Sequence, residues 1–195
     1  ILQPDSYAYN RCQQLYGDNS DDDDNDDNNT DVGEERKKSY INTDEFQIMF
    51  LRCELFDAIK AARRLIDYVE LMYALHGDLG LHRRIRLDDF SDAELQFVKS
   101  SDTHLLPARD RAGRRIVFTH SHNDPSVLLI TAESRLRILW YIFMSLADDV
   151  ETQRKGAIVI MWYHNLTTFD DFSSMGKIYK SSKCLPFRVG ALHIC

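Results

Sequence analysis

The fold is decided by the stretch Leu106-Pro107-Ala108-Arg109-Asp110-Arg111-Ala112-Gly113-Arg114-Arg115-Ile116-Val117-Phe118, in which a polar turn leads into an apolar run. Gly113 can adopt the positive φ that a tight turn needs. The β-branched and aromatic residues that follow favour a pleated, half-buried strand. The stretch therefore predicts a turn and then a strand over residues 115–120.

Strand and helix patterns alternate after this turn. We predict strands at 115–120, 157–163 and 188–195, and helices at 131–149 and 169–182. The run from Ala157 to Trp162 is apolar without interruption, as expected for a central strand covered on both faces. This order predicts an α/β fold with a β-α-β sheet domain, in which part of the sheet is parallel and helices cover it.

The residues before the turn follow a helical pattern. Apolar side chains recur at spacings of three and four between Phe46 and Met72, and Asp57 can cap a helix that ends near Gly77. Ser91 and Glu94 have the spacing of a capping box. These signals predict a helical amino-terminal lobe over residues 41–105.

The first 40 residues are expected to form a disordered acidic segment. Residues 1–35 contain eleven acidic side chains and one basic side chain, and residues 17–39 contain almost nothing apolar to bury. The net charge of −7 therefore leaves +3 for the remainder of the chain. That balance permits contact with an anionic membrane surface, and it is too weak to indicate nucleic-acid binding.

Cysteine usage and hydropathy indicate the compartment. The four cysteines are scattered and accompany no secretory signal, which predicts a cytoplasmic protein. No apolar run approaches the ~18 residues of a membrane-spanning helix, so we expect only transient, peripheral membrane association. The chain starts without Met and stops inside a predicted strand, so we expect a fragment truncated at the carboxyl end.

Four segments, in this order, resemble the CRAL-TRIO lipid-binding family: Phe50-Leu51-Arg52, Asp110-x-x-Gly113-Arg114, Val150-Glu151-Thr152-Gln153-Arg154-Lys155-Gly156 and Leu185-Pro186-Phe187-Arg188-Val189. The third segment, with the run from Phe118 to Pro125, is most similar to the tocopherol-transfer branch. Arg115 replaces the family's proline, and Trp162-Tyr163-His164-Asn165 replaces its Asp-x-x-Gly. The resemblance makes residues 106–195 a partial CRAL-TRIO domain.

The resemblance implies a non-enzymatic protein that binds a phosphoinositide, phospholipid, tocopherol or retinoid and transfers it between membranes, with no cofactor or metal. The ligand would lie between the sheet and the helix at 131–149. The implied lining residues are Leu136, Leu139, Phe143, Ala157, Val159 and Met161, and Arg188 would meet a lipid phosphate. Ile158, Ile160 and Trp162 would pack on helices. A bulky or charged residue at Phe143 would then abolish lipid loading and leave the fold intact.

Two other functions stay open at this point. His120, His122 and Asp124 could ligate a metal in a hydrolase, although Pro125 stands where such enzymes place a further histidine and the run also fits a turn. A protein-interaction scaffold with a filled cavity is the other alternative. Arg83, Arg84 and Arg86 suit a phosphate headgroup or a solvated face paired with Asp88 and Asp89. The oligomeric state is not indicated.

Overall fold

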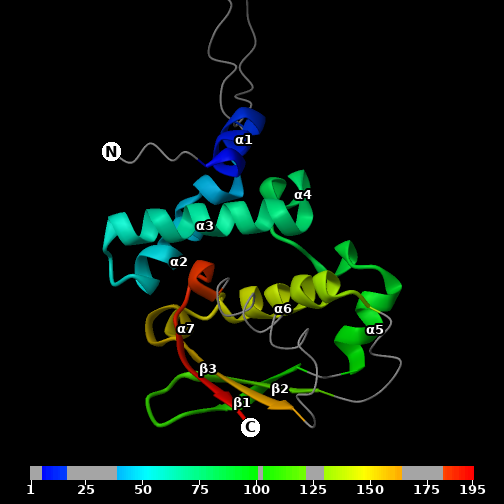
Figure 1. The fold of residues 1–195 in the computed structure, drawn as a ribbon. Helices are drawn as coiled ribbons and strands as arrows, with labels where there is room; N and C mark the ends of the chain where they lie inside the picture. The colour runs from blue at the N-terminus through cyan, green and yellow to red at the C-terminus, as the bar shows by residue number, and fades with distance from the viewer. Residues whose placement is uncertain (1–5, 17–38, 101–102, 122–129, 164–181) are drawn as a thin grey trace, which may run out of the picture.

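One sheet and a stack of helices above it make up the described part of the chain (Figure 1). The computed structural model describes residues 6–16, 39–100, 103–121, 130–163 and 182–195. Residues 169–181 of the predicted helix, and most of the predicted acidic segment, lie outside these ranges.

The sheet has four strands in the order β1-β2-β3-β4. They are β1 (Thr103–Arg109), β2 (Arg115–Ser121), β3 (Ala157–Tyr163) and β4 (Val189–Ile194). β1 is antiparallel to β2, whereas β2, β3 and β4 are parallel to one another. The prediction of an α/β fold with a partly parallel sheet is confirmed.

The hairpin between β1 and β2 contains the predicted turn. Asp110 Oδ1 accepts hydrogen bonds from the backbone N–H groups of Ala112 and Arg114 at 3.0 and 2.7 Å, and Gly113 has a φ of 79°. β1 itself was not predicted, because helical signals continued to residue 105. It is an edge strand, where Pro107 is tolerated, and the boundary placed at 105 falls inside it.

The amino-terminal lobe is helical, as predicted. It contains η1 (Tyr40–Asn42), α2 (Asp44–Cys53), α3 (Ala58–His76) and α4 (Asp78–His82). Asp57 caps α3 by accepting from the Lys60 N–H, and Gly77 ends it with a φ of 59°. Next come η2 (Leu87–Asp89) and α5 (Asp92–Ser100), the latter preceded by the predicted capping box of Ser91 and Glu94.

Part of the segment predicted as disordered is a helix. α1 (Tyr7–Tyr16) buries Ala8 and Cys12 in the main core. Its start is anchored by Ser6, whose hydroxyl donates to Glu70, and its middle by Arg11, which pairs with Asp78 at 3.1 Å. The disorder prediction is therefore wrong for residues 7–16, because partners more than 60 positions away stabilise a weakly apolar helix.

The predicted helix at 131–149 ends earlier, and a second short helix follows it. α6 (Ala132–Leu146) is capped by the Thr131 side chain, and α7 (Val150–Lys155) begins four residues after α6 ends. η4 (Ser182–Cys184) precedes β4. No described helix is long and apolar enough to cross a membrane.

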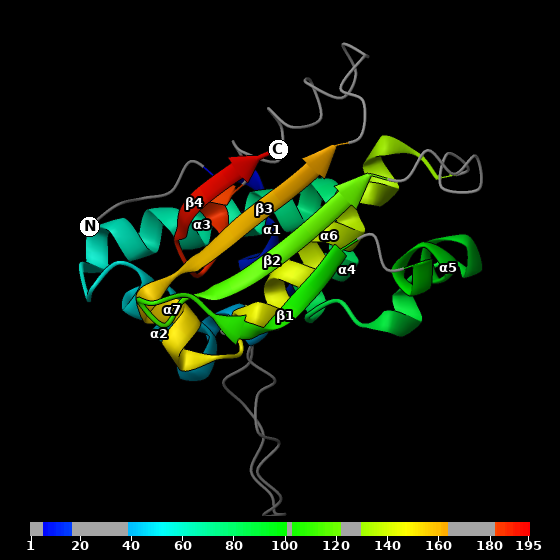
Figure 2. The same cartoon turned by 90° about the horizontal axis from the view of Figure 1, so that it is seen from below.

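The described helices lie on one side of the sheet. Figure 2 shows the other side, with the four strands in front of the helices. Val117, Val159 and Met161 on the inner face are buried, whereas Trp162 is 53% exposed. The prediction that Trp162 packs on a helix is wrong for the described residues, because alternation along β3 turns it to the uncovered face.

Candidate lipid-binding site

The side chains that were predicted to line a lipid pocket lie together between α6 and the sheet. Leu139, Phe143, Ala157, Val159 and Met161 are buried members of one core cluster, and Leu136 packs at its border. They therefore share one apolar layer. Within this layer the side chains pack on one another, and Phe143 meets Phe187 edge to face at 6.3 Å between ring centroids.

The apolar layer continues past α6 onto the edge strand β4. Leu192 pairs with Val159 and Ile194 pairs with Met161 across the parallel ladder, so these four residues share the inner face. Leu192 is 37% exposed and Ile194 is 48% exposed, whereas Val159 and Met161 are buried. The inner face of the sheet is thus apolar from its covered centre to its accessible edge. Leu192 and Ile194 were not among the predicted site residues; their alternation with His193 marks them as one face of a strand but does not say which face is covered.

All four segments that carry the family resemblance meet at one end of the molecule. The Arg52 guanidinium donates to Gln153 Oε1 at 3.0 Å, which joins the first segment to the third across 101 residues. The Arg188 carbonyl accepts from the Ala157 N–H at 2.9 Å, and the Arg188 guanidinium donates to the Arg154 carbonyl at 2.6 Å. We call this region, formed by residues 50–53, 109–115, 149–157 and 185–188, the motif junction.

Asp149 links the β1–β2 hairpin to the motif junction. Burial alone would raise the pKa of Asp149, but hydrogen bonds from Thr152 and Arg109 and the nearby charge of Arg115 lower it to about 2. The carboxylate is therefore ionised at neutral pH, and Arg109 is held by it at 2.6 Å. These contacts fix the hairpin against the start of α7.

Arg188, the predicted phosphate contact, has an exposed side chain at the motif junction. Its guanidinium reaches the carboxyl end of α7, where the Arg154 carbonyl accepts its hydrogen bond. It lies at the opposite end of β4 from Ile194, so Arg188 is about 13 Å from Leu192 and about 20 Å from Ile194 along the strand. That separation suits a polar head and an extended apolar tail.

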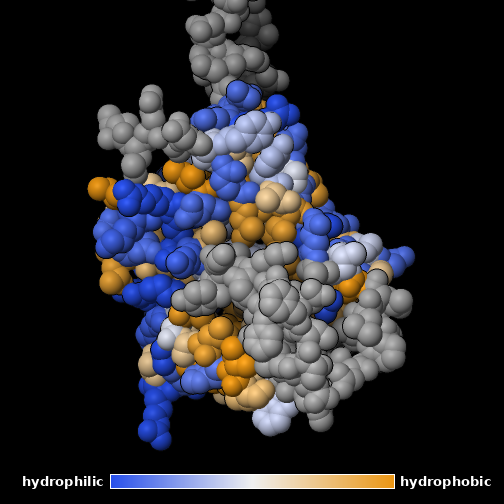
Figure 3. Space-filling view, in the orientation of Figure 1, coloured by the Kyte–Doolittle hydropathy of each residue, from blue (hydrophilic) through white to orange (hydrophobic). Residues whose placement is uncertain are grey.

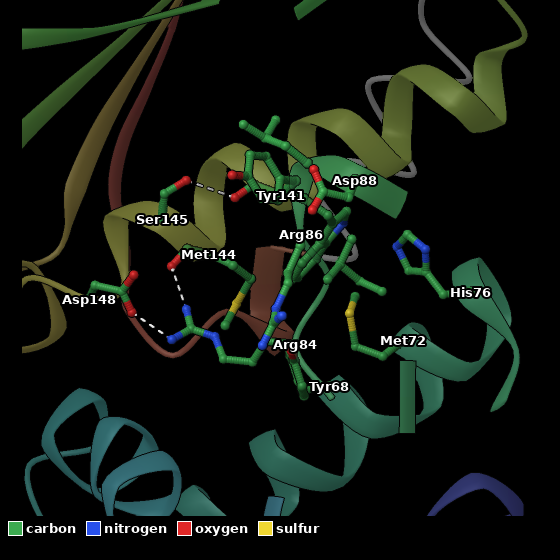
Figure 4. A pocket seen from close by; sticks show the side chains of 13 residues that line it. Tyr68, Met72, His76, Arg84, Arg86, Asp88, Tyr141, Met144, Ser145 and Asp148 are labelled. Carbon is green, nitrogen blue, oxygen red and sulfur yellow. Dashed lines mark hydrogen bonds and ion pairs between the residues drawn. The ribbon is translucent and has the colours of Figure 1, made fainter. Parts of the chain in front are cut away.

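A separate pocket of about 460 Å³ lies between α3, the segment 84–88 and α6. Its lining includes Met72 from α3 and Trp140 and Met144 from α6, together with the charged side chains of Arg84, Arg86, Asp88 and Asp148 (Figure 4). None of the predicted lipid-lining residues borders it. The pocket faces the amino-terminal lobe, so it is distinct from the layer between α6 and the sheet.

Arg83, next to this pocket in the sequence, and Arg84, which lines it, are each paired with a carboxylate. Arg83 binds Asp89 through two hydrogen bonds of 2.7 and 2.5 Å, which lowers the pKa of Asp89 to about 2. Arg84 binds Asp148 at 2.7 Å and the Met144 carbonyl at 3.2 Å, as Figure 4 shows. Arg86 and Asp88 also line the pocket. The pairing of Arg83 and Arg84 with carboxylates therefore fits a solvated surface of ion pairs better than a dedicated phosphate site.

His76 lines this pocket, and its Nδ1 atom is buried with no hydrogen-bond partner among the described residues. Burial, followed by the charge of Arg137, lowers the pKa of His76 to about 4 from its usual 6.5. At a pH between the folded pKa of about 4 and the usual pKa of 6.5, this histidine binds a proton in the unfolded chain but not in the folded protein. Acidification through this window therefore favours unfolding.

We expect the free energy of unfolding of the unmodified protein to fall by on the order of 2 kcal/mol between about pH 7 and pH 5, and that of His76→Gln to fall less. Urea unfolding at both pH values measures the two slopes. Asp89 does not affect this comparison. The stability that its ionised carboxylate contributes is lost only as the pH falls from about 4 toward its folded pKa of about 2. Equal slopes in the two proteins would show that His76 is already protonated in the fold.

The predicted metal cluster is only partly within the described residues. His120 lies on β2, where its ring stacks on His104 with 6.0 Å between centroids, whereas His122 and Asp124 lie outside the described ranges. Among the residues that are described, no group of three potential ligands could hold a metal ion. The four cysteines are all unpaired.

The geometry thus gives one apolar layer that reaches an accessible strand, and a junction that joins the four motif segments. Sequence reasoning missed the contact between Arg52 and Gln153, because nothing in either segment alone indicates its partner. No protein-family model matches this chain, and no curated protein matches it.

Proposed function

We propose that this chain binds a hydrophobic lipid as a CRAL-TRIO-like domain and transfers it between membranes without catalysing a reaction. The observation that carries the proposal is the apolar inner face of the sheet, which runs from buried Val159 and Met161 to exposed Leu192 and Ile194. A lipid tail on this face would contact apolar side chains along its length. The order and the contacts of the motif segments support the same assignment.

A lipid could enter in two ways. In the first, α6 moves away from the sheet; in the second, α6 stays in place and the lipid tail lies beside it on β4. The second route disturbs less of the structure, because Leu192 and Ile194 are already accessible. Each CH₂ group of the tail that leaves water contributes about 0.8 kcal/mol. Release is then favourable only where an equally apolar destination is present, so transfer requires membrane contact. Arg188 would bind the phosphate of a phospholipid at the other end of β4.

A protein-interaction scaffold is the second candidate. It is favoured by the close packing of Leu139, Phe143, Ala157, Val159 and Met161, which fill the layer where the resemblance implies a cavity. In a scaffold these side chains would stay in place, and the accessible part of β4 would contact protein. Lipid content therefore distinguishes the two functions.

The test is native mass spectrometry with lipid extraction on the protein purified from cells. We expect one lipid per chain in the unmodified protein and at least a tenfold loss of occupancy in Leu192→Asp, because an ionised carboxylate on the apolar face opposes tail binding. His193→Asp is the matched control, since His193 is an exposed neighbour on the opposite face of the same strand.

Retained lipid in His193→Asp and lost lipid in Leu192→Asp would support the proposed site. Equal lipid occupancy in all three proteins would contradict it. A purified protein without lipid or metal would favour the scaffold, and a stoichiometric transition metal would favour the hydrolase.

A further inference from the structure

The turn between α2 and α3 exposes three large apolar side chains at the surface. Leu55 is 69% exposed, Phe56 is 65% exposed and Ile59, in the first turn of α3, is 59% exposed. We call these three residues the α2–α3 corner. Figure 3 shows hydrophobic side chains at the left edge of the molecule, where Figure 1 places this turn, with hydrophilic side chains beside them.

The backbone of the corner adopts a conformation that its residues do not favour. Leu55 and Phe56 have φ values of 54° and 65°, in the left-handed region that glycine and asparagine enter most readily. The Phe56 N–H donates to the Leu51 carbonyl at 2.7 Å and the Asp57 N–H donates to the Glu54 carbonyl at 3.0 Å. The turn is therefore held by hydrogen bonds, while its two central side chains are poorly suited to both the conformation and the solvent. Such positions often serve function.

One cationic side chain lies beside the corner on α3 and two lie on the segment that packs against α3; we call these three residues the cationic border. Exposed Arg63 lies one helical turn from Ile59 on α3, and exposed Lys183 lies on η4, which packs against α3. Exposed Arg188 follows on the same segment, which is tied to the lobe by the Arg64 guanidinium donating to the Leu185 carbonyl at 3.0 Å. None of Arg63, Lys183 and Arg188 forms an ion pair with a carboxylate of the described residues.

The acidic side chains near the corner are mostly neutralised by local partners. Asp57 pairs with Lys60 at 3.0 Å, and Glu54 pairs with Arg64 in a half-buried contact. Asp67, one turn further along α3, is exposed and subtracts one charge. The corner and its border therefore carry a net positive charge, even though the whole chain is acidic.

We propose that the α2–α3 corner docks this protein on anionic lipid bilayers, with Leu55, Phe56 and Ile59 entering the interface and Arg63, Lys183 and Arg188 contacting the headgroups. A compact apolar projection within a cationic border matches a bilayer, where an acyl region lies below a layer of negative charge. A groove on a protein would need a shape complementary to this corner, whereas a bilayer adapts to it.

The test is sedimentation with vesicles of phosphatidylcholine alone and of equal parts phosphatidylcholine and phosphatidylserine. We expect binding to the anionic vesicles, weaker binding to the neutral ones and a decrease with salt. The double variant Leu55→Asn with Phe56→Asn should bind at least tenfold more weakly, because two apolar side chains no longer leave water. Arg63→Gln should weaken binding about fivefold.

Stability separates docking from a structural role. Asparagine tolerates the left-handed conformation, so the double variant should keep or raise the melting temperature while binding falls. Leu105→Ser is the matched control, since Leu105 is an exposed apolar residue on β1, away from the corner. Unchanged vesicle binding in the double variant would overturn the proposal. A concentration-dependent dimer that the double variant abolishes, without vesicle binding, would assign the corner to protein contact and would also overturn it.

The biological purpose of membrane docking rests on the proposed lipid transfer, but the two proposals are tested by different measurements and can fail separately. Vesicle binding is measured without reference to bound lipid, and lipid occupancy is measured without vesicles. Failure of the corner variants to change sedimentation would leave lipid binding untouched. Failure of Leu192→Asp to change lipid occupancy would leave membrane docking untouched.

Discussion

Gly156→Ala is expected to lower the free energy of unfolding by about 4 kcal/mol or more. Gly156 ends α7 with a φ of 86° and a ψ of −173°, a region that is essentially restricted to glycine. A Cβ at this position would lie 2.4 Å from the Arg188 carbonyl oxygen. That oxygen already accepts the Ala157 N–H bond that aligns β4 with β3. Because both obstacles are backbone, no side-chain rotation can relieve them.

Gly77→Ala is the control for the backbone conformation alone. Gly77 has a φ of 59° and a ψ of −147°, and a Cβ there would meet nothing within 4 Å. We expect this variant to lose about 2 kcal/mol. Urea unfolding of both variants then isolates the contact with Arg188 as the difference. Equal losses would show that the motif junction opens readily at this point, contrary to the packing described above.

Phe143→Ala is expected to lower the free energy of unfolding by about 3–5 kcal/mol, as large core truncations do. The Phe143 side chain is 2% exposed, lies in the layer between α6 and the sheet and contacts Phe187 from the segment before β4. The burial of Phe143 argues against the sequence-based expectation that a charged residue there would leave the fold intact, and we now expect such a variant to be destabilised. An unpaired charge in this layer would be more destabilising than the truncation.

Phe56→Ala is the matched control for Phe143→Ala, because Phe56 is exposed and its replacement should change stability by about 0.5 kcal/mol or less. Chemical unfolding measures both. A loss below about 1 kcal/mol for Phe143→Ala would mean that α6 packs loosely on the sheet. Such a layer could open for a lipid tail, so this outcome would favour entry beneath α6 over entry beside it.

The helices of the amino-terminal lobe, α6 and three of the strands could be predicted because their signals are local, whereas α1 was missed. The β-branched residues of β2 and β3 favour strands wherever they lie, and the Asp57 cap and the Gly77 stop act within a few residues of their own positions. The Asp110–Gly113 turn is likewise closed by hydrogen bonds within five residues.

The face of β3 that is covered could not be predicted from its own residues. The strand is apolar on both sides, so alternation gives no polar face to mark the solvent. The choice of Ala157, Val159 and Met161 as inward-facing came from the family resemblance, and the structure places them inside. Trp162 was assigned to a covered position for the same lack of a polar signal, and it is exposed.

The sequence by itself determined the kind and order of most elements between residues 41 and 195 and the turn that starts the parallel part of the sheet, because propensity, caps and hydrophobic spacing act over one or two helical turns. Only the tertiary structure decided that α1 forms, that Arg52 meets Gln153 and that the apolar inner face extends to Leu192 and Ile194. These features depend on residues far apart in the chain, and the free energy that fixes them comes from burial and pairing that exist only after the chain has folded.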